Sequence, residues 1–206
     1  FSGAPAIHMA LGAFFSAMEV IPLLLLTYEA WRFMRLGGAG PNESTIDTAP
    51  ERFPHKWAVM YLIAVGFWNF LGAGVFGFLI NLPIISYYEI GTQFTANHAH
   101  GSMMGVYGML AIGFLVFVAR YFMPRDRGSE RAMRWSFWGL NLGLAWMVFV
   151  NLVPLGTWQF YDSARYGYFH ARQPEFFAQP GIRLIEWLRL PGDLVFIVAG
   201  ILPVCY

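Results

Sequence analysis

Long apolar blocks separated by short charged loops constrain this chain more than any other feature of its sequence. The segment 57–82 contains only Asn69 and Asn81 as strongly polar residues, and no amphipathic rhythm divides it. Charged residues make up 12% of the chain, about half the fraction found in soluble domains. A helix needs about 20 consecutive apolar residues to cross the hydrocarbon core of a bilayer. We therefore expect an all-α protein, a polytopic bundle of transmembrane helices.

The apolar blocks predict five spans within a single membrane domain that covers residues 1–206. The spans lie at about residues 5–31, 57–82, 95–122, 135–155 and 194–206. The last apolar run stops after about 13 residues, which is too short to cross a bilayer, and the chain opens abruptly with FSGAPAIHMALG. We therefore expect a fragment of a longer polypeptide that supplies about five helices of a larger bundle.

The basic residues of the predicted loops indicate how the helices are oriented. They cluster after the first and third spans, and short loops rich in Lys and Arg face the cytoplasm. These residues are Arg32, Arg35, Arg52, Lys56, Arg120, Arg125, Arg127, Arg131 and Arg134. The connection 81–93 and the aromatic segment 156–183, expected as an interfacial loop, then lie on the outer side. The net charge of +1 indicates no nucleic-acid partner, and the single cysteine, Cys205, excludes an internal disulfide.

Two histidines, His98 and His100, lie near the outer end of the third predicted span. Positions i and i+2 of an α-helix are separated by about 200°, so the two imidazoles cannot ligate one metal. Either each serves its own centre, or both are interfacial residues bonded to headgroups or loop carbonyls. Ionisable groups inside membranes often mark functional sites, and histidine is a common axial ligand of heme iron. Gly101, Gly105 and Gly108 thin one side of this helix, as the close approach of a macrocycle or a second helix requires.

Glu19 lies near the middle of the first predicted span. A charged carboxylate at that depth costs several kcal/mol unless it is protonated, paired or hydrated. Pro22 cannot donate a hydrogen bond to the carbonyl of Met18, so we expect the helix to bend beside Glu19. The open alternatives are a protonated glutamic acid that hydrogen bonds across helices and a carboxyl group with a functional role.

The stretch ANHAHGSMMGVYG resembles the tenth core helix of subunit I of the heme–copper oxidase superfamily, where a His-x-His pair ligates two hemes. The resemblance implies a heme–copper oxidase subunit I-like bundle with two hemes b. It implies that His98 is the proximal ligand of a high-spin, catalytic heme. It also implies that His100 is an axial ligand of a low-spin, electron-transferring heme, with both hemes toward the outer side of the membrane.

Three stretches in order, FSAMEVIPLLLL, WNFLGAGVFGFLINLP and GTQFTANHAHG, resemble the eighth, ninth and tenth helices of bacterial nitric oxide reductases. In that family a glutamate on the eighth helix lies by a non-heme iron and tunes it or delivers protons. The resemblance assigns this role to Glu19. Most ligands of the non-heme iron belong to the sixth and seventh helices, which precede the region of this chain. His8, near the start of the first span, and His55 and His170, in loops, are not convincing substitutes.

The closing segment RLIEWLRLPGDLVFIVAGILP resembles the quinol-oxidising branch of the nitric oxide reductases. There Asp193 would accept a hydrogen bond and then a proton from a quinol hydroxyl. The alternative is that Asp193 caps the last helix, where a carboxylate favours the positive N-terminal end. Arg183 and Arg189 pair with heme propionates in one interpretation and extend from the helix end toward water in the other.

The resemblance implies quinol-dependent reduction of nitric oxide to nitrous oxide in a bacterial cytoplasmic membrane. The expected partners are the remaining N-terminal part of the same polypeptide, quinol, nitric oxide and membrane lipid. Three alternatives stay open. They are a nitric oxide dismutase-like relative, a heme–copper oxygen reductase, and a non-catalytic heme-binding protein that transfers electrons.

Overall fold

The computed structural model describes residues 5–35, 55–122 and 127–204, and every regular element in these ranges is helical. The α-helices are α1 (Ala6–Met18), α2 (Val20–Arg35), α3 (Lys56–Trp68), α4 (Gly77–Asn81), α5 (Pro83–Glu89), α6 (Gln93–His100), α7 (Met109–Ala119), α8 (Arg127–Trp146), α9 (Val153–Tyr166), α10 (Pro174–Phe177), α11 (Pro180–Trp187) and α12 (Arg189–Ile201). Three π-helical segments join some of them: η2 (Asn69–Phe76), η3 (Gly101–Gly108) and η4 (Met147–Leu152). Two short 3₁₀ turns complete the set: η5 (His170–Arg172) and η6 (Leu202–Val204).

In the described ranges, four helices are long and apolar enough to cross a membrane: Ala6–Arg35, Lys56–Asn81, Gln93–Ala119 and Glu130–Tyr166. The all-helical membrane bundle expected from the sequence is therefore confirmed. The fourth helix has 37 residues, a length of about 55 Å, and so extends well beyond a hydrocarbon core of about 30 Å. Residues 156–166, expected as part of a loop, belong to this helix. Helix α12 overlaps the fifth predicted span but begins earlier, at Arg189.

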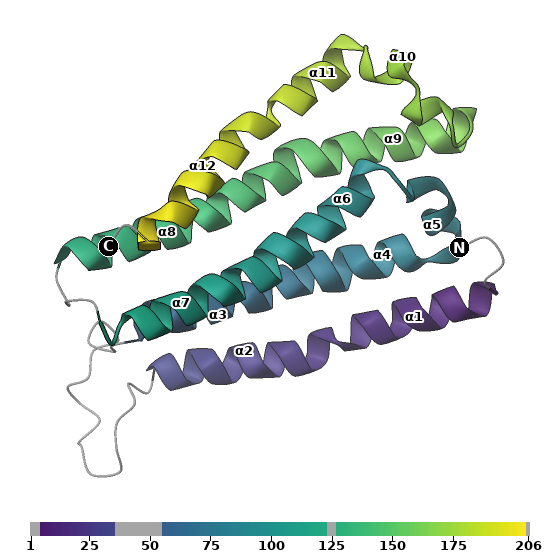
Figure 1. Ribbon diagram of the computed structural model, residues 1–206. Helices are drawn as coiled ribbons and strands as arrows, with labels where there is room; N and C mark the ends of the chain where they lie inside the picture. Colours follow the sequence, from purple (N-terminus) through teal and green to yellow (C-terminus); the bar gives the residue numbers. More distant parts are fainter. Residues whose placement is uncertain (1–4, 36–54, 123–126, 205–206) are drawn as a thin grey trace.

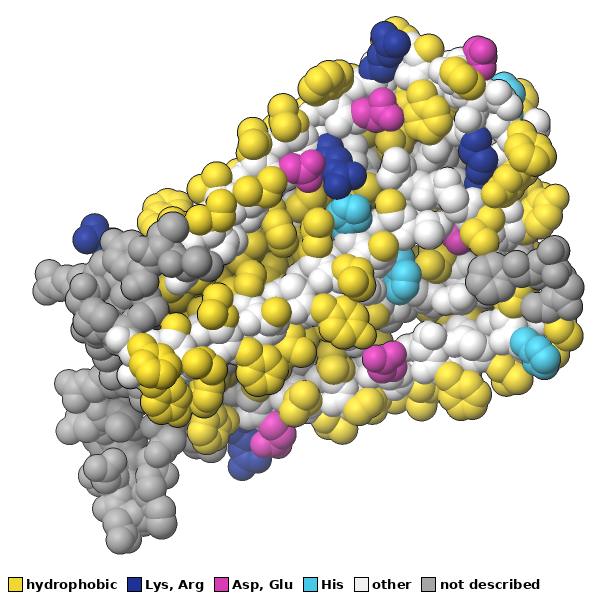
Figure 2. Space-filling view, viewed as in Figure 1, with side chains coloured by type: hydrophobic (Ala, Val, Ile, Leu, Met, Phe, Trp, Pro, Cys, Tyr) yellow, Lys and Arg dark blue, Asp and Glu magenta, His cyan; other side chains and the backbone are white. Residues whose placement is uncertain are grey.

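The long helices lie side by side and alternate in direction along the chain, and α11 and α12 return along α9 and α8 (Figure 1). The apolar core lies where α3, α7 and α8 meet, around the fully buried side chains of Tyr61, Trp68, Met109 and Leu140. Hydrogen bonds cross this core: Tyr61 Oη and Ser136 Oγ are 2.8 Å apart. Most of the coloured side chains on the face seen in Figure 2 are apolar, as in helices that span membranes.

The first long helix is interrupted at Glu19, where α1 ends and α2 begins. The backbone N–H of Glu19 still donates to the Phe15 carbonyl at 3.3 Å. Pro22, one turn further on, has no N–H with which to continue the ladder to the Met18 carbonyl. The bend expected beside Glu19 is therefore confirmed, and its physical cause is the proline.

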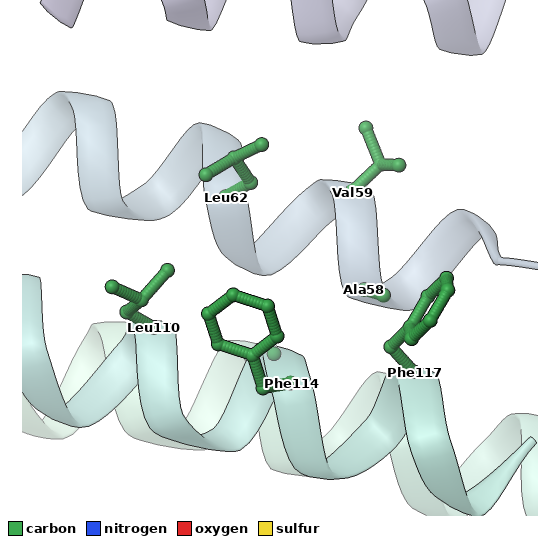
Figure 3. Close-up of a pocket in the computed structure, with 7 residues that line it drawn as sticks. Ala58, Val59, Leu62, Leu110, Phe114 and Phe117 are labelled. Carbon is green, nitrogen blue, oxygen red and sulfur yellow. The ribbon is translucent and has the colours of Figure 1, made fainter.

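An apolar pocket opens between α3 and α7, at the end of the bundle where α7 stops (Figure 3). Its volume is about 170 Å³, and all seven lining residues are apolar: Ala58, Val59, Leu62, Leu110, Gly113, Phe114 and Phe117. Leu110 follows His100 by about 15 Å of helix. None of these side chains could bind a charged ligand, so this pocket is not a candidate for the functional site.

The opposite end of the bundle, here called the cap end, consists of residues 83–92 and 167–179. Gly91 and Gly167 adopt φ angles of 75° and 101° there, in the region that favours glycine, and these turns reverse the chain after α5 and end α9. A small apolar cluster of Leu155, Ala171, Phe176 and Ile182 fixes the second part of this end against α9. The cap end is therefore packed rather than a set of free loops.

Glu89, in the cap end and outside the four long helices, is only 3% exposed. Burial raises the pKa of its carboxyl group above the usual 4.5, although a hydrogen bond from Thr95 and the charge of Arg172 oppose this change. Because the pKa is higher in the folded state, the contribution of Glu89 to stability is complete below about pH 4.5 and is lost as the pH rises through the folded pKa.

Replacing Glu89 with glutamine is therefore expected to stabilise the protein increasingly as the pH rises. The melting temperature of Glu89→Gln minus that of the wild type, measured in detergent from about pH 4 to about pH 8, should become more positive. Glu175→Gln, at an exposed position in α10, is the matched control and should show no such trend. A difference for Glu89→Gln that stays constant over this range would contradict the prediction.

Candidate functional site: two histidines on one helix

The helix that carries His98 and His100 begins at the cap end. Thr92 is its N-cap residue, and the Thr92 hydroxyl accepts a hydrogen bond from the N–H of Phe94 at 3.3 Å. Helix α6 runs from Gln93 to His100 and continues without a break into η3. Both histidines are half-buried near the end of α6. The sequence therefore places two imidazoles on a helix that is capped at one end and continued at the other.

His98 faces η2, on one side of its helix. Its Nδ1 atom lies 2.8 Å from the Gly72 carbonyl oxygen. A carbonyl oxygen only accepts, so Nδ1 is protonated and donates, and in the neutral ring the lone pair is on Nε2. The ring also lies over Gly77, because a Cβ atom added there would be 3.0 Å from His98 Cε1. The Gly72 carbonyl thus fixes both the orientation and the tautomer of His98.

His100 faces α12, on another side of the same helix. Its Nδ1 atom donates to the Ala96 carbonyl at 2.7 Å, which again leaves the lone pair on Nε2. The guanidinium of Arg189 donates to that Nε2 atom at 3.0 Å. Arg189 also pairs with Asp193, with 3.0 Å between Nε and Oδ2. Figure 2 shows histidine, basic and acidic side chains together between the α6 and α12 helices.

The two imidazoles therefore bond through Nδ1 to different carbonyls and lie in separate surroundings, as the 200° separation predicts. A histidine that binds a metal through one nitrogen usually donates the other N–H to a carbonyl or carboxylate, as both of these rings do. Among the residues that the structure describes, no three His, Cys, Asp or Glu side chains form a group that could hold a metal ion. The donor set fits two separate groups, such as hemes, that each take a single imidazole from this chain.

The glycines beside the histidines bring two helices into backbone contact. A Cβ atom on Gly101 would lie 2.6 Å from Gly72 Cα, and one on Gly105 would lie 2.5 Å from Trp68 Cβ. Both distances are far shorter than a carbon–carbon contact of about 3.5–4.0 Å. Gly101 and Gly105 therefore serve the approach of a second helix. This approach also brings the Gly72 carbonyl within reach of His98.

The other candidate residues lie apart from the histidine pair. Glu19 is exposed at the break between α1 and α2, and its carboxyl group has no hydrogen-bond or ion-pair partner in the described part of the chain. His8 is exposed on α1, while the ring of His55 stacks on Phe117 at 4.5 Å. His170 pairs with Asp162 at 2.6 Å. No contact in the described ranges joins these groups to His98 or His100.

Two contacts of the site are not evident from the sequence. The first is the Gly72 carbonyl on His98, a backbone group for which the glycine pattern of 72–77 is only an indirect signal. The second is Arg189 on His100, because the two residues are 89 positions apart. The sequence suggested Arg189 only as a partner for propionates or as a side chain that extends toward water. Cys205 and Arg52 lie outside the described residues.

Comparison with known proteins identifies the family to which this chain belongs. Residues 1–195 match the family described as cytochrome c and quinol oxidase polypeptide I. A nitric oxide reductase subunit of Stutzerimonas stutzeri is 29% identical over 158 residues, which are 74% of this chain and 29% of the relative. The chain thus spans less than a third of the length of that relative. Because the family match covers nearly the whole sequence, the chain belongs to the heme–copper oxidase subunit I family.

Proposed function

We propose that this chain is part of a membrane-bound nitric oxide reductase that takes its electrons from quinol. In the balanced reaction, two nitric oxide molecules and one quinol give nitrous oxide, water and quinone. The observation that carries the proposal is the pair of oriented histidines, each with Nδ1 bonded to a carbonyl and Nε2 turned to a different side. The name of the relative, a nitric oxide reductase, supports the choice of substrate.

His98 would hold a high-spin heme b and His100 a low-spin heme b. When bound, these groups supply binding of nitric oxide and electron transfer, together with a non-heme iron whose other ligands lie outside this chain. The protein contributes orientation, because the Gly72 and Ala96 carbonyls each fix one imidazole. A fixed ring also keeps its lone pair on Nε2, the atom that a metal needs.

Arg189 and Asp193 would act at the His100 side of the helix. The Arg189 guanidinium lies beside His100 and is held by the Asp193 carboxylate. A heme iron on His100 Nε2 would use the lone pair that accepts from Arg189 here, so in the full protein this cation would leave Nε2 and face the propionate groups of the low-spin heme, with which arginine pairs well. Asp193, a third exposed, would accept a hydrogen bond and then a proton from a quinol hydroxyl. The quinol would thus be oxidised next to the group that receives its electrons.

Glu19 would deliver or relay the protons that the reduction consumes. Its neighbours Ala17 and Val20 line an apolar cavity of about 270 Å³ between the helix break and η2–α4. An apolar space admits a small uncharged molecule such as nitric oxide and excludes ions. Glu19 itself is exposed and does not line this cavity, but it lies near the middle of a long apolar helix, where an ionisable group is otherwise unfavourable, and this supports a functional carboxyl.

The proposal is tested by measuring nitric oxide consumption in the full-length protein reconstituted in lipid vesicles. With quinol as donor we expect turnover, with one nitrous oxide formed per two nitric oxide molecules consumed. Reduced cytochrome c in place of quinol should not support the reaction. Consumption of oxygen without nitric oxide turnover would refute the proposed substrate, and turnover with cytochrome c alone would refute the proposed donor.

Replacing Glu19 with glutamine is expected to lower the turnover number about 100-fold, the loss typical of a group that transfers protons. The heme absorption spectrum should remain that of the wild type, because Glu19 does not contact either histidine. The matched control is Glu29→Gln, which is also exposed on the same long helix but pairs with Arg32 at 3.9 Å. If Glu19→Gln and Glu29→Gln had equal activities, Glu19 would have no role in proton delivery.

A further inference from the structure

Arg172, in the cap end, binds the chain just before the histidine-bearing helix. Its guanidinium donates to the Ile90 carbonyl at 2.5 Å and to the Ser163 hydroxyl at 3.1 Å, and also to the Tyr168 carbonyl. It stacks on the Tyr168 ring, 3.6 Å from the ring centroid. Hydrogen bonds from a charged donor are roughly twice as strong as neutral ones. One side chain therefore ties the turn before α6 to the end of α9.

Gln159, on α9, makes a second tie at the first residue of α6. Its Oε1 atom accepts the backbone N–H of Gln93 at 2.8 Å, and its Nε2 atom donates to the Ala171 carbonyl at 3.3 Å. The side chain is 2% exposed. Close to Gln159, helices α9 and α6 are in direct contact, since a Cβ atom on Gly156 would lie 2.8 Å from the backbone nitrogen of Phe94. The start of α6 is thus held by buried polar contacts.

Glu89 and Thr95 add a third tie across the same turn. The Thr95 hydroxyl donates to the Glu89 carboxylate at 2.9 Å and accepts the N–H of Gly91 at 3.2 Å. The charge of Arg172 also acts on Glu89. All three ties end on residues 89–95, which lie three to nine residues before His98. None of them involves a residue assigned above to binding or catalysis.

We propose that Arg172 and Gln159 are positioning residues that set the rotation and depth of α6, and so the directions of His98 and His100. This inference rests on the proposed function for its heme readout. A rigid helix transmits a rotation at its first turn to every side chain on it, and a slip of one residue turns each side chain by about 100°. The cap end therefore acts on both imidazoles at once, through backbone rather than through the rings.

The test compares Arg172→Gln with Arg165→Gln in the full-length protein carrying its hemes. Arg165 is the matched control because it lies in the last turn of α9, next to the cap end, and in the described part of the chain its side chain contacts the exposed rings of Tyr161 and Tyr166 rather than residues 89–95. We expect Arg172→Gln to speed hydrogen exchange of the backbone amides of residues 93–100 about tenfold, the effect of losing a charged hydrogen bond. It should also shift the low-spin and high-spin heme signals in electron paramagnetic resonance spectra, while Arg165→Gln changes neither property.

A second variant keeps the inference testable if Arg172→Gln does not fold. Gln159→Met keeps the shape of the side chain but removes its bond to Gln93, and should cause the same two changes. Wild-type exchange and wild-type heme spectra in the folded variants would overturn the positioning role. So would accelerated exchange with unchanged heme spectra, provided that His98→Ala and His100→Ala do change those spectra. If His98→Ala and His100→Ala leave the heme spectra unchanged, the assignment of hemes to these histidines is wrong. In that case the hydrogen exchange of residues 93–100 alone decides whether the cap end holds α6.

Discussion

Replacing His100 with alanine is expected to remove the low-spin heme signal from the full-length protein and leave the high-spin heme bound. Replacing His98 with alanine should do the reverse. The reason is that the two rings face different helices, so neither lies where it could replace the other: His98 contacts η2 and His100 contacts Arg189 of α12. Reduced-minus-oxidised absorption spectra and electron paramagnetic resonance spectra of the purified variants measure the two hemes separately. In each variant nitric oxide turnover should fall below detection.

The control for this experiment is His8→Ala, which removes an exposed imidazole from the same chain. It should retain both heme signals and the wild-type turnover. Loss of both hemes on replacing either histidine, with the protein still folded, would contradict independent ligation. If His98→Ala kept every heme while His100→Ala lost the only heme signal, the chain would instead match a protein that transfers electrons without a reaction centre.

Replacing Gly101 with alanine is expected to lower the free energy of unfolding by roughly 1–3 kcal/mol, the usual cost of overpacking. The new methyl group would lie 2.6 Å from Gly72 Cα, and a backbone cannot rotate away as a flexible side chain can. The helices must then separate, which lengthens the bond from His98 to the Gly72 carbonyl. Thermal unfolding in detergent measures the stability, and the high-spin heme signal reports the displacement of His98.

The matched substitution is Gly12→Ala, because among the described residues no atom outside its own stretch of helix lies within 4 Å of the position that its Cβ would occupy. This variant should be as stable as the wild type or slightly more stable, since alanine favours helix over glycine by about 1 kcal/mol. Equal melting temperatures for Gly101→Ala and Gly12→Ala would show that the close contact between η2 and η3 does not contribute to stability.

The parts of the fold that depend on local chemistry could be predicted from the sequence. Apolar runs of sufficient length predicted the first four long helices, and Pro22 predicted the break at Glu19. The separation of His98 and His100 follows from helical geometry alone. Each of these features is decided by residues close together in the chain.

The parts that depend on distant neighbours could not be predicted. Residues 156–166 mix aromatic and polar side chains as a loop does, yet they stay helical because α5, α6 and the cap end pack against α9. Likewise, the role of Arg172 depends on backbone carbonyls, which have no signature in residue type. The contact between Arg189 and His100 requires knowledge of how α12 folds back on the bundle.

The π-helical segment η3 affects how the histidine pair is oriented. Segment η3 follows His100 directly, and its wider turns leave the next stretch, α7, out of phase with a regular continuation of α6. The rotation of α6 about its own axis is therefore not determined by the way α7 packs against α3. Helices α6 and α7 can therefore each adopt the rotation that suits their own contacts. The packing of α7 against α3 and the orientation of the two histidines on α6 then place separate requirements on the sequence.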